Sequence, residues 1–363
     1  MEKQFKFKKR LIFNAVLSIF TCICYFSAYI SPQNYWIVGF LALTIPLCII
    51  FNFICLLHWF LLKSFNIFLP LATILIGFNF LQSTLNFHWT KEEIPTKSLK
   101  VLSYNVQVFN VYSHLQDKDS NSSKNMINWV AENDADIKCL QEVYNEEDSK
   151  VFASVKRISK KGKYKKFLTP VTSNNRFKVG FFGLAIFSRF PIINSGEVKF
   201  TANSSNTAIY ADILRGKDTI RVYNVHFQSM SIDELRIVKA EQYEEAKKTY
   251  QDLFTRLKNG FQNRAWQVNM LEKHIQNCPY PVILCGDFND TPYSYTYTRI
   301  KKNLNNAFEH AGNGFGFTFN GKLFFLRIDN QFVSDFFDVH SFKTHRNIPY
   351  SDHFPTTAIY TNK

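Results

Sequence analysis

Polar residues that can bind a cation or a phosphate group follow apolar, strand-like runs in this sequence. In the run PVILCGDFNDTP at 281–292, Val282–Cys285 leads through Gly286 into Asp287 and Asn289. This pattern predicts a buried strand that ends in a tight turn. Side chains two residues apart on an extended backbone point to the same side, so both can reach one ligand. An Asx-rich turn also forms for local reasons alone, by hydrogen-bonding its own backbone.

The same arrangement recurs at the ends of other strand-like runs. The polar residues found there are Asn105, Glu142, Asn224, His226, Asp287, Asn289, Asp329, Asp352 and His353. A single carboxylate at a strand end is usually just exposed to solvent, whereas six such clusters in one domain favour a shared site. Their side chains are of the kinds that bind a hard cation or a phosphate group. The sequence therefore predicts one such site.

Many strands and a few long helices must position these residues. Strands are predicted at Leu99–Val108, Ile137–Glu142, Gly183–Ser188, Ile209–Leu214, Ile220–His226, Val282–Cys285, Arg327–Ser334 and Phe354–Tyr360. Helices are predicted at Ser122–Glu132 and over Ser231–Gln276, the second with an interruption near Gly260. This combination predicts an α/β (α+β) domain in which two sheets form a sandwich flanked by helices.

The strand-end motifs resemble those of the endonuclease/exonuclease/phosphatase superfamily, whose members share the DNase I-like fold. In family order they are SYNV at 103–106, LQEV at 140–143, YNVHF at 223–227, GDFND at 286–290, RIDNQFVS at 327–334 and SDHFP at 351–355. The resemblance covers about Leu99–Tyr360. It implies a four-layer sandwich of two mostly antiparallel sheets flanked by helices, and a hydrolase that acts on phosphoric ester bonds.

The resemblance also implies a cation site. Glu142, with Asn105 and Asp352 nearby, would hold a divalent cation. All three offer oxygen ligands, which suit Mg²⁺ (magnesium) or Mn²⁺, whereas zinc would call for a Cys/His cage. A Mg²⁺- or Mn²⁺-dependent enzyme is therefore expected.

The catalytic groups that the resemblance implies lie in the last motifs. His353 would act on the attacking water or on the phosphate, with its imidazole oriented by Asp329. Asp287 and Asn289 would position the nucleophilic water and a phosphate oxygen. The reaction would be hydrolysis of a phosphodiester or phosphomonoester by an activated water.

Substrate contacts are implied for the YNVHF motif. His226, with Asn224 beside it in sequence, would bind the scissile phosphate or assist the leaving group.

Two positions depart from the family pattern. Gln107 stands where abasic-site endonucleases carry an acid, which weakens a nuclease assignment, and Asn330 stands where the family often has Tyr.

The first 90 residues predict a membrane anchor with about three transmembrane helices, at 11–30, 36–60 and 67–85. Each run is long enough to cross a hydrocarbon core, which takes roughly 20 helical residues. Residues 91–98 form a tether, and the catalytic domain covers 99–363. A cleaved signal peptide is the alternative for the first run.

The charges around these runs predict an orientation. Five cationic residues precede the first run, which places the N-terminus in the cytoplasm by the positive-inside rule. Three spans then put the catalytic domain on the extracytoplasmic side of a bacterial-type cytoplasmic membrane. Two spans would leave it in the cytoplasm.

Basic residues indicate anionic partners without identifying the substrate. The chain carries a net charge of +14, and Val155–Lys178 holds nine Lys and Arg and no acid. Such a segment can follow a nucleic-acid backbone, lie against anionic lipid, or be a solvated loop. The expected substrate is a lipid head group, a nucleic acid or a small phosphoester, and no protein partner is indicated. The alternatives are an endo- or exonuclease on DNA or RNA and a non-catalytic phosphate- or lipid-binding protein.

Overall fold

The computed structural model describes residues 2–88, 94–117, 121–170, 180–200, 206–230 and 243–363. The chain divides into two compact units. The helical unit comprises Met1–Leu85, Met230–Trp266 and Thr291–Arg299, and the sandwich unit comprises Asn86–Ser229, Gln267–Asp290 and Ile300–Lys363. Two segments from within the predicted catalytic domain therefore group with the N-terminal helices.

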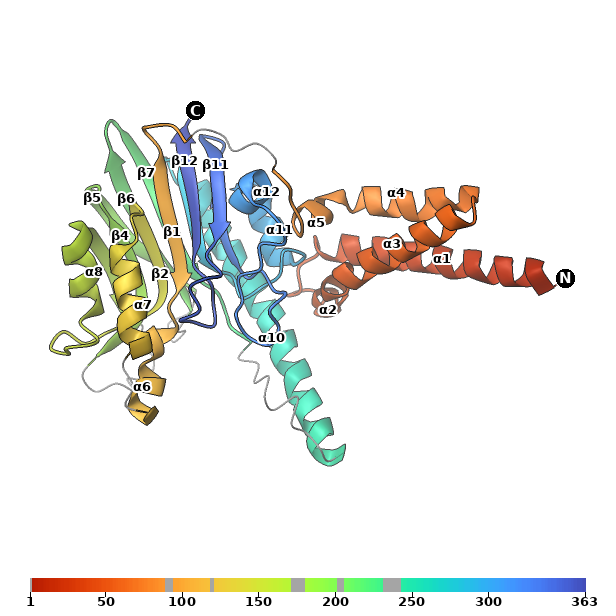
Figure 1. Cartoon of the computed structure of the whole chain (residues 1–363), viewed down its shortest axis with the longest axis horizontal. Coiled ribbons are helices and arrows are strands. Elements are labelled where there is room, and N and C mark those ends of the chain that lie inside the picture. Colours follow the sequence, from red (N-terminus) through yellow and green to blue (C-terminus); the bar gives the residue numbers. More distant parts are fainter. Residues whose placement is uncertain (1, 89–93, 118–120, 171–179, 201–205, 231–242) are drawn as a thin grey trace. The chain divides into compact units, whose positions relative to one another are not determined.

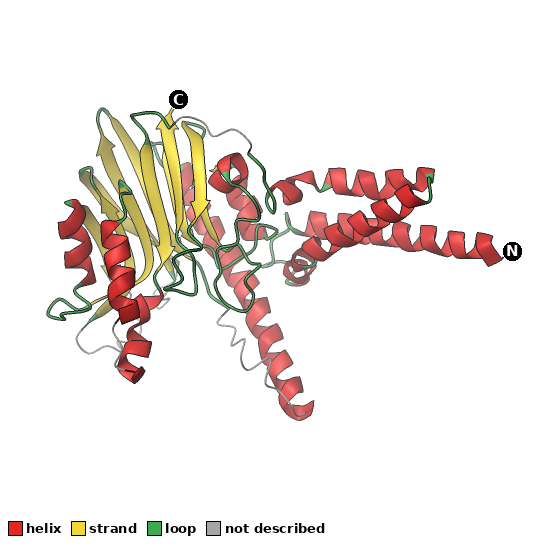
Figure 2. Cartoon of the chain, viewed as in Figure 1, coloured by secondary structure: helices red, strands yellow, loops and turns green. Residues whose placement is uncertain are grey.

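The sandwich unit contains two six-stranded sheets (Figures 1 and 2). The first has the order β11 (Phe337–Thr344), β12 (Thr356–Asn362), β1 (Leu99–Asn105), β2 (Ile137–Asn145), β4 (Phe181–Ser188) and β3 (Lys165–Pro170). The second has the order β5 (Ile192–Lys199), β6 (Thr207–Arg215), β7 (Asp218–His226), β8 (Val282–Asp287), β10 (Asp329–Val333) and β9 (Asn305–Asn306). Neighbouring strands are antiparallel except for the parallel pairs β1–β2 and β7–β8.

Alternating side chains build the layers of this unit. Inward-facing residues such as Val101 of β1 and Ile209 of β6 form an apolar core between the sheets. On the outer face of the first sheet, α7 (Asn121–Glu132) and α8 (Ser154–Gly162) pack through residues such as Met126 and Ile158. On the second sheet, the Tyr223 hydroxyl lies 2.8 Å from Nδ1 of His274, in the C-terminal part of α10 (Tyr243–Gln276). The predicted sandwich with flanking helices is confirmed.

Two predicted boundaries differ in the structure. The predicted strand Leu99–Val108 ends at Asn105, because the Asn105 side-chain oxygen accepts the backbone N–H of Gln107 (3.0 Å) and the chain turns. The next segment, η2 (Gln107–Asn110), has φ from +42° to +57° at all four residues. Helix α10 continues through Gly260 without the predicted interruption, and residues 231–242 lie outside the described part of the chain.

The pattern of the sequence did not predict several shorter elements. Besides α8, β3, β5, β9 and β11, these are α6 (Val111–Asp117), α11 (Tyr295–Lys301) and α12 (Ala307–Ala311). The basic segment at 155–178 forms most of α8 and β3, and its part from 171 onwards is outside the described residues.

Gly286 permits the close approach of β7 and β8 beside the strand ends. Its φ is +147°, and a Cβ built there would lie 2.0 Å from the carbonyl oxygen of Val225. We expect Gly286→Ala to lower the free energy of unfolding by about 3 kcal/mol or more, since backbone atoms must move apart. Chemical denaturation of the full chain measures this.

Gly216→Ala is the matched control, because Gly216 also has positive φ (+66°) but no atom within 4 Å of the built Cβ. It isolates the conformational cost, which is about 1 kcal/mol. Equal effects of the two substitutions would contradict the steric argument.

The helical unit begins with α1 (Glu2–Ser27), followed by α2 (Ile37–Leu43), α3 (Ile45–Leu61), η1 (Phe65–Ile67), α4 (Phe68–Ile76) and α5 (Phe78–Gln82). Of the described helices, Phe7–Ser27 is long and apolar enough to cross a membrane, and α2 with α3 would be a second such span if the pair, bent by 44°, is counted as one. The third predicted span, 67–85, is divided at Gly77. The Tyr25 ring packs there, since a Cβ on Gly77 would lie 2.1 Å from its Cζ. Three spans remain a prediction.

The helical unit combines hydrogen bonds between its helices with apolar side chains on its outer surface. Asn52 Nδ2 donates to the Thr21 hydroxyl and Trp59 Nε1 donates to Asn14 Oδ1, both at 2.9 Å. In contrast, Phe26 of α1 is 68% exposed. Interhelical hydrogen bonds combined with an apolar outer surface are typical of helices in lipid.

Candidate active site

Strand register in the second sheet brings three predicted residues into one row. His226 lies opposite Asp287 in the parallel pair β7–β8, and Asp329 lies opposite Asp287 in the antiparallel pair β8–β10. Asp287 and Asp329 are 1% and 2% exposed. Three motifs that are far apart in the sequence therefore meet at the same edge of the sheet.

A β-bulge positions Glu142 in the first sheet. The register between β2 and β4 shifts between Leu140 and Val143, and both of these residues pack toward the helices. Regular alternation cannot put residues 140 and 143 on one face, so the bulge supplies one extra residue. Glu142 has φ +54°, a strained value for a residue with a side chain. The strain redirects its carboxylate.

Asn105 links the two sheets at this edge. Its Nδ2 donates to Glu142 Oε1 (3.3 Å) in the first sheet and to Asp287 Oδ2 (3.0 Å) in the second. His226 Nε2 lies 3.5 Å from the same Glu142 oxygen and 3.7 Å from the same Asp287 oxygen. These four side chains therefore form one cluster.

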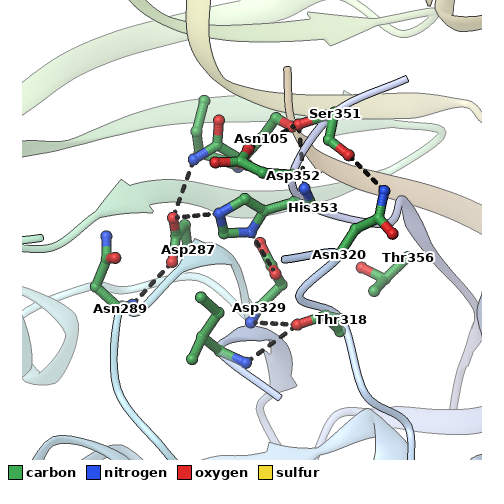
Figure 3. Close-up of polar contacts among 12 residues, drawn as sticks. Asn105, Asp287, Asn289, Thr318, Asn320, Asp329, Ser351, Asp352, His353 and Thr356 are labelled. Atoms are coloured by element: carbon green, nitrogen blue, oxygen red, sulfur yellow. Dashed lines mark hydrogen bonds and ion pairs between the residues drawn. The ribbon is translucent and has the colours of Figure 1, made fainter. Parts of the chain in front are cut away.

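His353 lies between two carboxylates (Figure 3). Its Nδ1 is 2.8 Å from Asp329 Oδ2, and its Nε2 is 3.6 Å from Asp287 Oδ2. Burial opposes the charged imidazolium, yet the carboxylates of Asp329 and Asp287 raise the pKa of His353 well above its ordinary value. Because the charged ring carries a proton on each nitrogen, His353 is arranged as a hydrogen-bond donor.

Asn289 completes the turn after β8. Its backbone N–H donates to Asp287 Oδ1 (2.8 Å), and its Nδ2 donates to the Phe227 carbonyl (3.0 Å). Its φ of +50° is one that Asn tolerates better than most residues. The turn therefore fixes Asp287 on one side while Asn105 fixes it on the other.

Asn224 has a different position from the one expected. It is fully buried, its Nδ2 donates to the carbonyls of Leu140 (2.8 Å) and Ala185 (3.0 Å), and its Oδ1 accepts from Gln141 Nε2 (2.6 Å). These contacts join the two sheets behind the site. Since they use both donors and the oxygen of the amide, we leave Asn224 out of the proposed substrate contacts.

The donor set at Glu142 fits a hard divalent cation. Burial raises the pKa of Glu142, the Asp352 carboxylate raises it further, and His226 opposes this. A cation placed there would relieve the repulsion between the two carboxylates. Rotation of the Asn105 amide by half a turn would add its oxygen to the set, in exchange for its hydrogen bonds to Gln107, Glu142 and Asp287.

A second group of potential ligands is better suited to proton transfer. Asp287, Asp329 and His353 form the one group found among the described residues with three ligand atoms within 4.8 Å of one another. Within this group, His353 Nδ1 and Asp329 Oδ2 are already hydrogen-bonded to each other, which orients the imidazole. We therefore assign the group to catalysis rather than to the cation.

Several residues that support the site were not assigned a site role from the sequence. The Thr318 hydroxyl accepts the N–H groups of Ile328 (3.0 Å) and Asp329 (3.1 Å), and the Ser351 hydroxyl donates to the Asn105 carbonyl (2.8 Å). Gln107 Oε1 accepts the N–H of Asp352 (3.3 Å). Ser351 lies in a motif, which is a signal, whereas nothing near Thr318 marks it.

Asp329 holds His353 in one orientation, and its removal has a predictable result. We expect Asp329→Asn to lower kcat for phosphoester hydrolysis by about 10²-fold, because the amide neither orients nor charges the imidazole equally well. Steady-state kinetics measure this, with Asp335→Asn, an exposed carboxylate a few residues further along the chain, as control. A change in KM alone would contradict the orienting role.

Comparisons with known proteins identify the family. A model of the endonuclease/exonuclease/phosphatase family matches residues 102–353, which is more than half of the chain. The chain therefore belongs to this family. Residues 6–84 match a domain of unknown function, DUF8431. A search of curated proteins finds no significant match.

Solved structures support the same fold. An endonuclease/exonuclease/phosphatase from Bacteroides vulgatus is 15% identical, with 74% of this chain and 100% of that chain covered and a TM-score of 0.53. A family member from Bacteroides thetaiotaomicron is 18% identical over 75% and 100%, with a TM-score of 0.51. A mannosyl-6-phosphatase from Bacteroides thetaiotaomicron VPI-5482 is 17% identical over 72% and 99%, also with a TM-score of 0.51. At these identities the likeness shows the DNase I-like fold.

Proposed function

We propose that this protein is a membrane-anchored, divalent-metal-dependent phosphoesterase that hydrolyses a phosphodiester or phosphomonoester by attack of an activated water. The observation that carries the proposal is the buried chain of contacts from Asp329 through His353 to Asp287, with Glu142 and Asn105 beside it. A binding protein of the same fold needs phosphate-binding groups, but it does not need a histidine oriented by a carboxylate.

We assign each residue a step in the reaction that this geometry would allow. Asp287, fixed from both sides, accepts the proton of the attacking water. His353 donates from Nε2 to a phosphate oxygen, and Asp329 stabilises its charge. As the water oxygen bonds to phosphorus, the bond from phosphorus to the leaving-group oxygen breaks. His226 binds the same phosphate or that leaving oxygen, and Asn289 orients the water.

A divalent cation would be held by Glu142 with Asp352 and Asn105. When bound, Mg²⁺ or Mn²⁺ would neutralise the negative charge that develops on the phosphate. The protein residues named above then position the water, accept its proton and donate hydrogen bonds to the phosphate, and little covalent chemistry is required of them.

The membrane placement is proposed from the helical unit. Apolar residues dominate its exposed surface, while polar residues such as Asn52 and Trp59 bond to neighbouring helices. Cations before the first apolar helix favour a cytoplasmic N-terminus. An odd number of spans puts the sandwich unit on the extracytoplasmic side of the membrane.

The substrate class is open between phosphoesters met at a membrane and nucleic acid. Basic α8 and β3 present exposed residues such as Lys156, Lys160 and Lys165, which suit either anionic partner. Gln107, which stands where abasic-site endonucleases carry an acid, favours the first. One solved relative is named a mannosyl-6-phosphatase, so sugar phosphates belong in the test panel as well.

A panel assay of the full chain in detergent tests the proposal. It offers supercoiled and abasic DNA, RNA, sphingomyelin, phosphoinositides, mannose 6-phosphate and bis-p-nitrophenyl phosphate, with and without chelator. We expect cation-dependent turnover of at least one phosphoester. Binding of these compounds without any turnover would support the non-catalytic alternative, and DNA or RNA cleavage alone would support the nuclease.

A further inference from the structure

The sandwich unit contains a cavity, with a volume of about 640 Å³, that is separate from the candidate active site. It is lined by β11, α12, the glycine-rich loop at 312–317, and His88. None of the residues assigned above to catalysis or to the cation belongs to its lining.

Basic groups line this cavity without acidic counterparts. They are His88, His310, His340, Lys343 and Arg346, and the described lining includes no Asp or Glu. The nearby acids have other cationic partners, since Glu309 pairs with Lys301 at 2.6 Å and Asp338 lies 3.9 Å from Lys363. Such a cavity attracts anions.

Several of these basic groups are held in place by the chain around them. His88 donates from Nδ1 to the Gly312 carbonyl (2.7 Å), and its backbone N–H donates to Asn313 Oδ1 (2.7 Å). The Arg346 guanidinium lies over the rings of Phe317 (5.7 Å) and Phe354 (5.8 Å). Fixed donors lose less conformational entropy when they bind a ligand.

The three histidines of the cavity do not form a cation site. In the described parts of the chain, the sole cluster of three ligand atoms within 4.8 Å of one another is the one at His353. Imidazoles that do not converge, accompanied by Lys343 and Arg346, suit an anion instead.

We propose that this cavity binds the phosphate group of an anionic ligand. Lys343 and Arg346 would donate to the phosphate oxygens, as such side chains commonly do. Phe315 and Phe317, whose rings stack at 5.1 Å, offer an apolar surface for the remainder of the ligand. The Phe315 side chain is 50% exposed and therefore open to contact.

The ligand that we expect to carry this phosphate is an anionic phospholipid. His88, which lines the cavity, comes six residues after α5 ends at Gln82. The cavity therefore includes the first residues of the sandwich unit that follow the apolar helices. Six extended residues reach at most about 20 Å. This choice of source rests on the proposed membrane anchoring. A soluble phosphate ester offers the same group, and the experiment separates the two.

Native mass spectrometry of the full chain in detergent tests the inference, with phosphatidylglycerol and phosphatidylcholine offered in turn. The pocket variant is Lys343→Ala with Arg346→Ala. The matched control, Lys217→Ala with Lys273→Ala, removes the same charge from exposed positions outside the cavity and outside α8 and β3. We expect the wild type and the control to retain phosphatidylglycerol, and the pocket variant to retain about tenfold less, because two charged contacts are lost.

Equal retention of both lipids by the wild type would contradict the choice of an anionic phospholipid. An equal loss of retained phosphatidylglycerol in the two double variants would contradict binding at this cavity. Inorganic phosphate provides the second arm. If it raises the unfolding temperature of the wild type but not of the pocket variant, while neither lipid is retained, the pocket stands and its ligand is soluble. Unfolding temperatures without ligand verify that the variants fold. No measurement here requires turnover, so failure of the proposed enzymatic function leaves this test intact.

Discussion

Asp287→Asn is expected to abolish phosphoester hydrolysis while leaving the fold intact. The amide keeps the shape of the side chain and can still accept the Asn289 N–H, but it cannot accept a proton from water. It also removes the charge that faces Nε2 of His353, 3.6 Å away. We expect kcat to fall by about 10³-fold or more. His353→Ala should have a loss of the same order, because the donor to the phosphate is absent.

Asp338→Asn is the matched control, because Asp338 is an exposed carboxylate of β11 outside the site. Kinetics of all three variants on whichever substrate the panel identifies, together with their unfolding temperatures, provide the measurement. Near-normal turnover by the Asp287 or His353 variant would remove these residues from the mechanism. Loss of activity with loss of folding would show a structural role instead.

The positions of the candidate catalytic side chains could be predicted from the sequence because each one lies at or close to an end of a recognisable strand. Asp287, His226 and Asp329 are adjacent in space through the register of three neighbouring strands, and register follows from the same apolar alternation that marks the strands. For such residues, a position in the sequence motif nearly determines a position in the fold.

Other features depended on contacts that a local pattern does not contain. Glu142 reaches the site through a bulge with positive φ, although its motif suggests a regular strand. Asn224 carries a motif position but joins the sheets from a fully buried place. The apolar run at 67–85 is divided at Gly77, where the Tyr25 ring packs, and hydropathy alone does not reveal such packing.

Removal of divalent cations is expected to eliminate activity, and Glu142→Gln is expected to raise the Mn²⁺ concentration that restores it. Burial and the neighbouring Asp352 carboxylate raise the pKa of Glu142, and a bound cation would stabilise its charged form. The neutral amide keeps one oxygen but loses that charge. After chelation, we expect Mn²⁺ to restore the wild type fully, and the variant to need about 100-fold more Mn²⁺ for half-maximal rate.

Glu147→Gln is a suitable control, because Glu147 is an exposed acid that follows β2 by two residues and faces a separate cavity with Lys156 and Lys160. Electron paramagnetic resonance of free and bound Mn²⁺ supplies a readout that does not need turnover. Chelator-resistant hydrolysis would exclude the cation from the reaction. If Asp329→Asn weakens Mn²⁺ binding and Glu142→Gln does not, the cation binds instead at Asp287, Asp329 and His353, whose ligand atoms also converge.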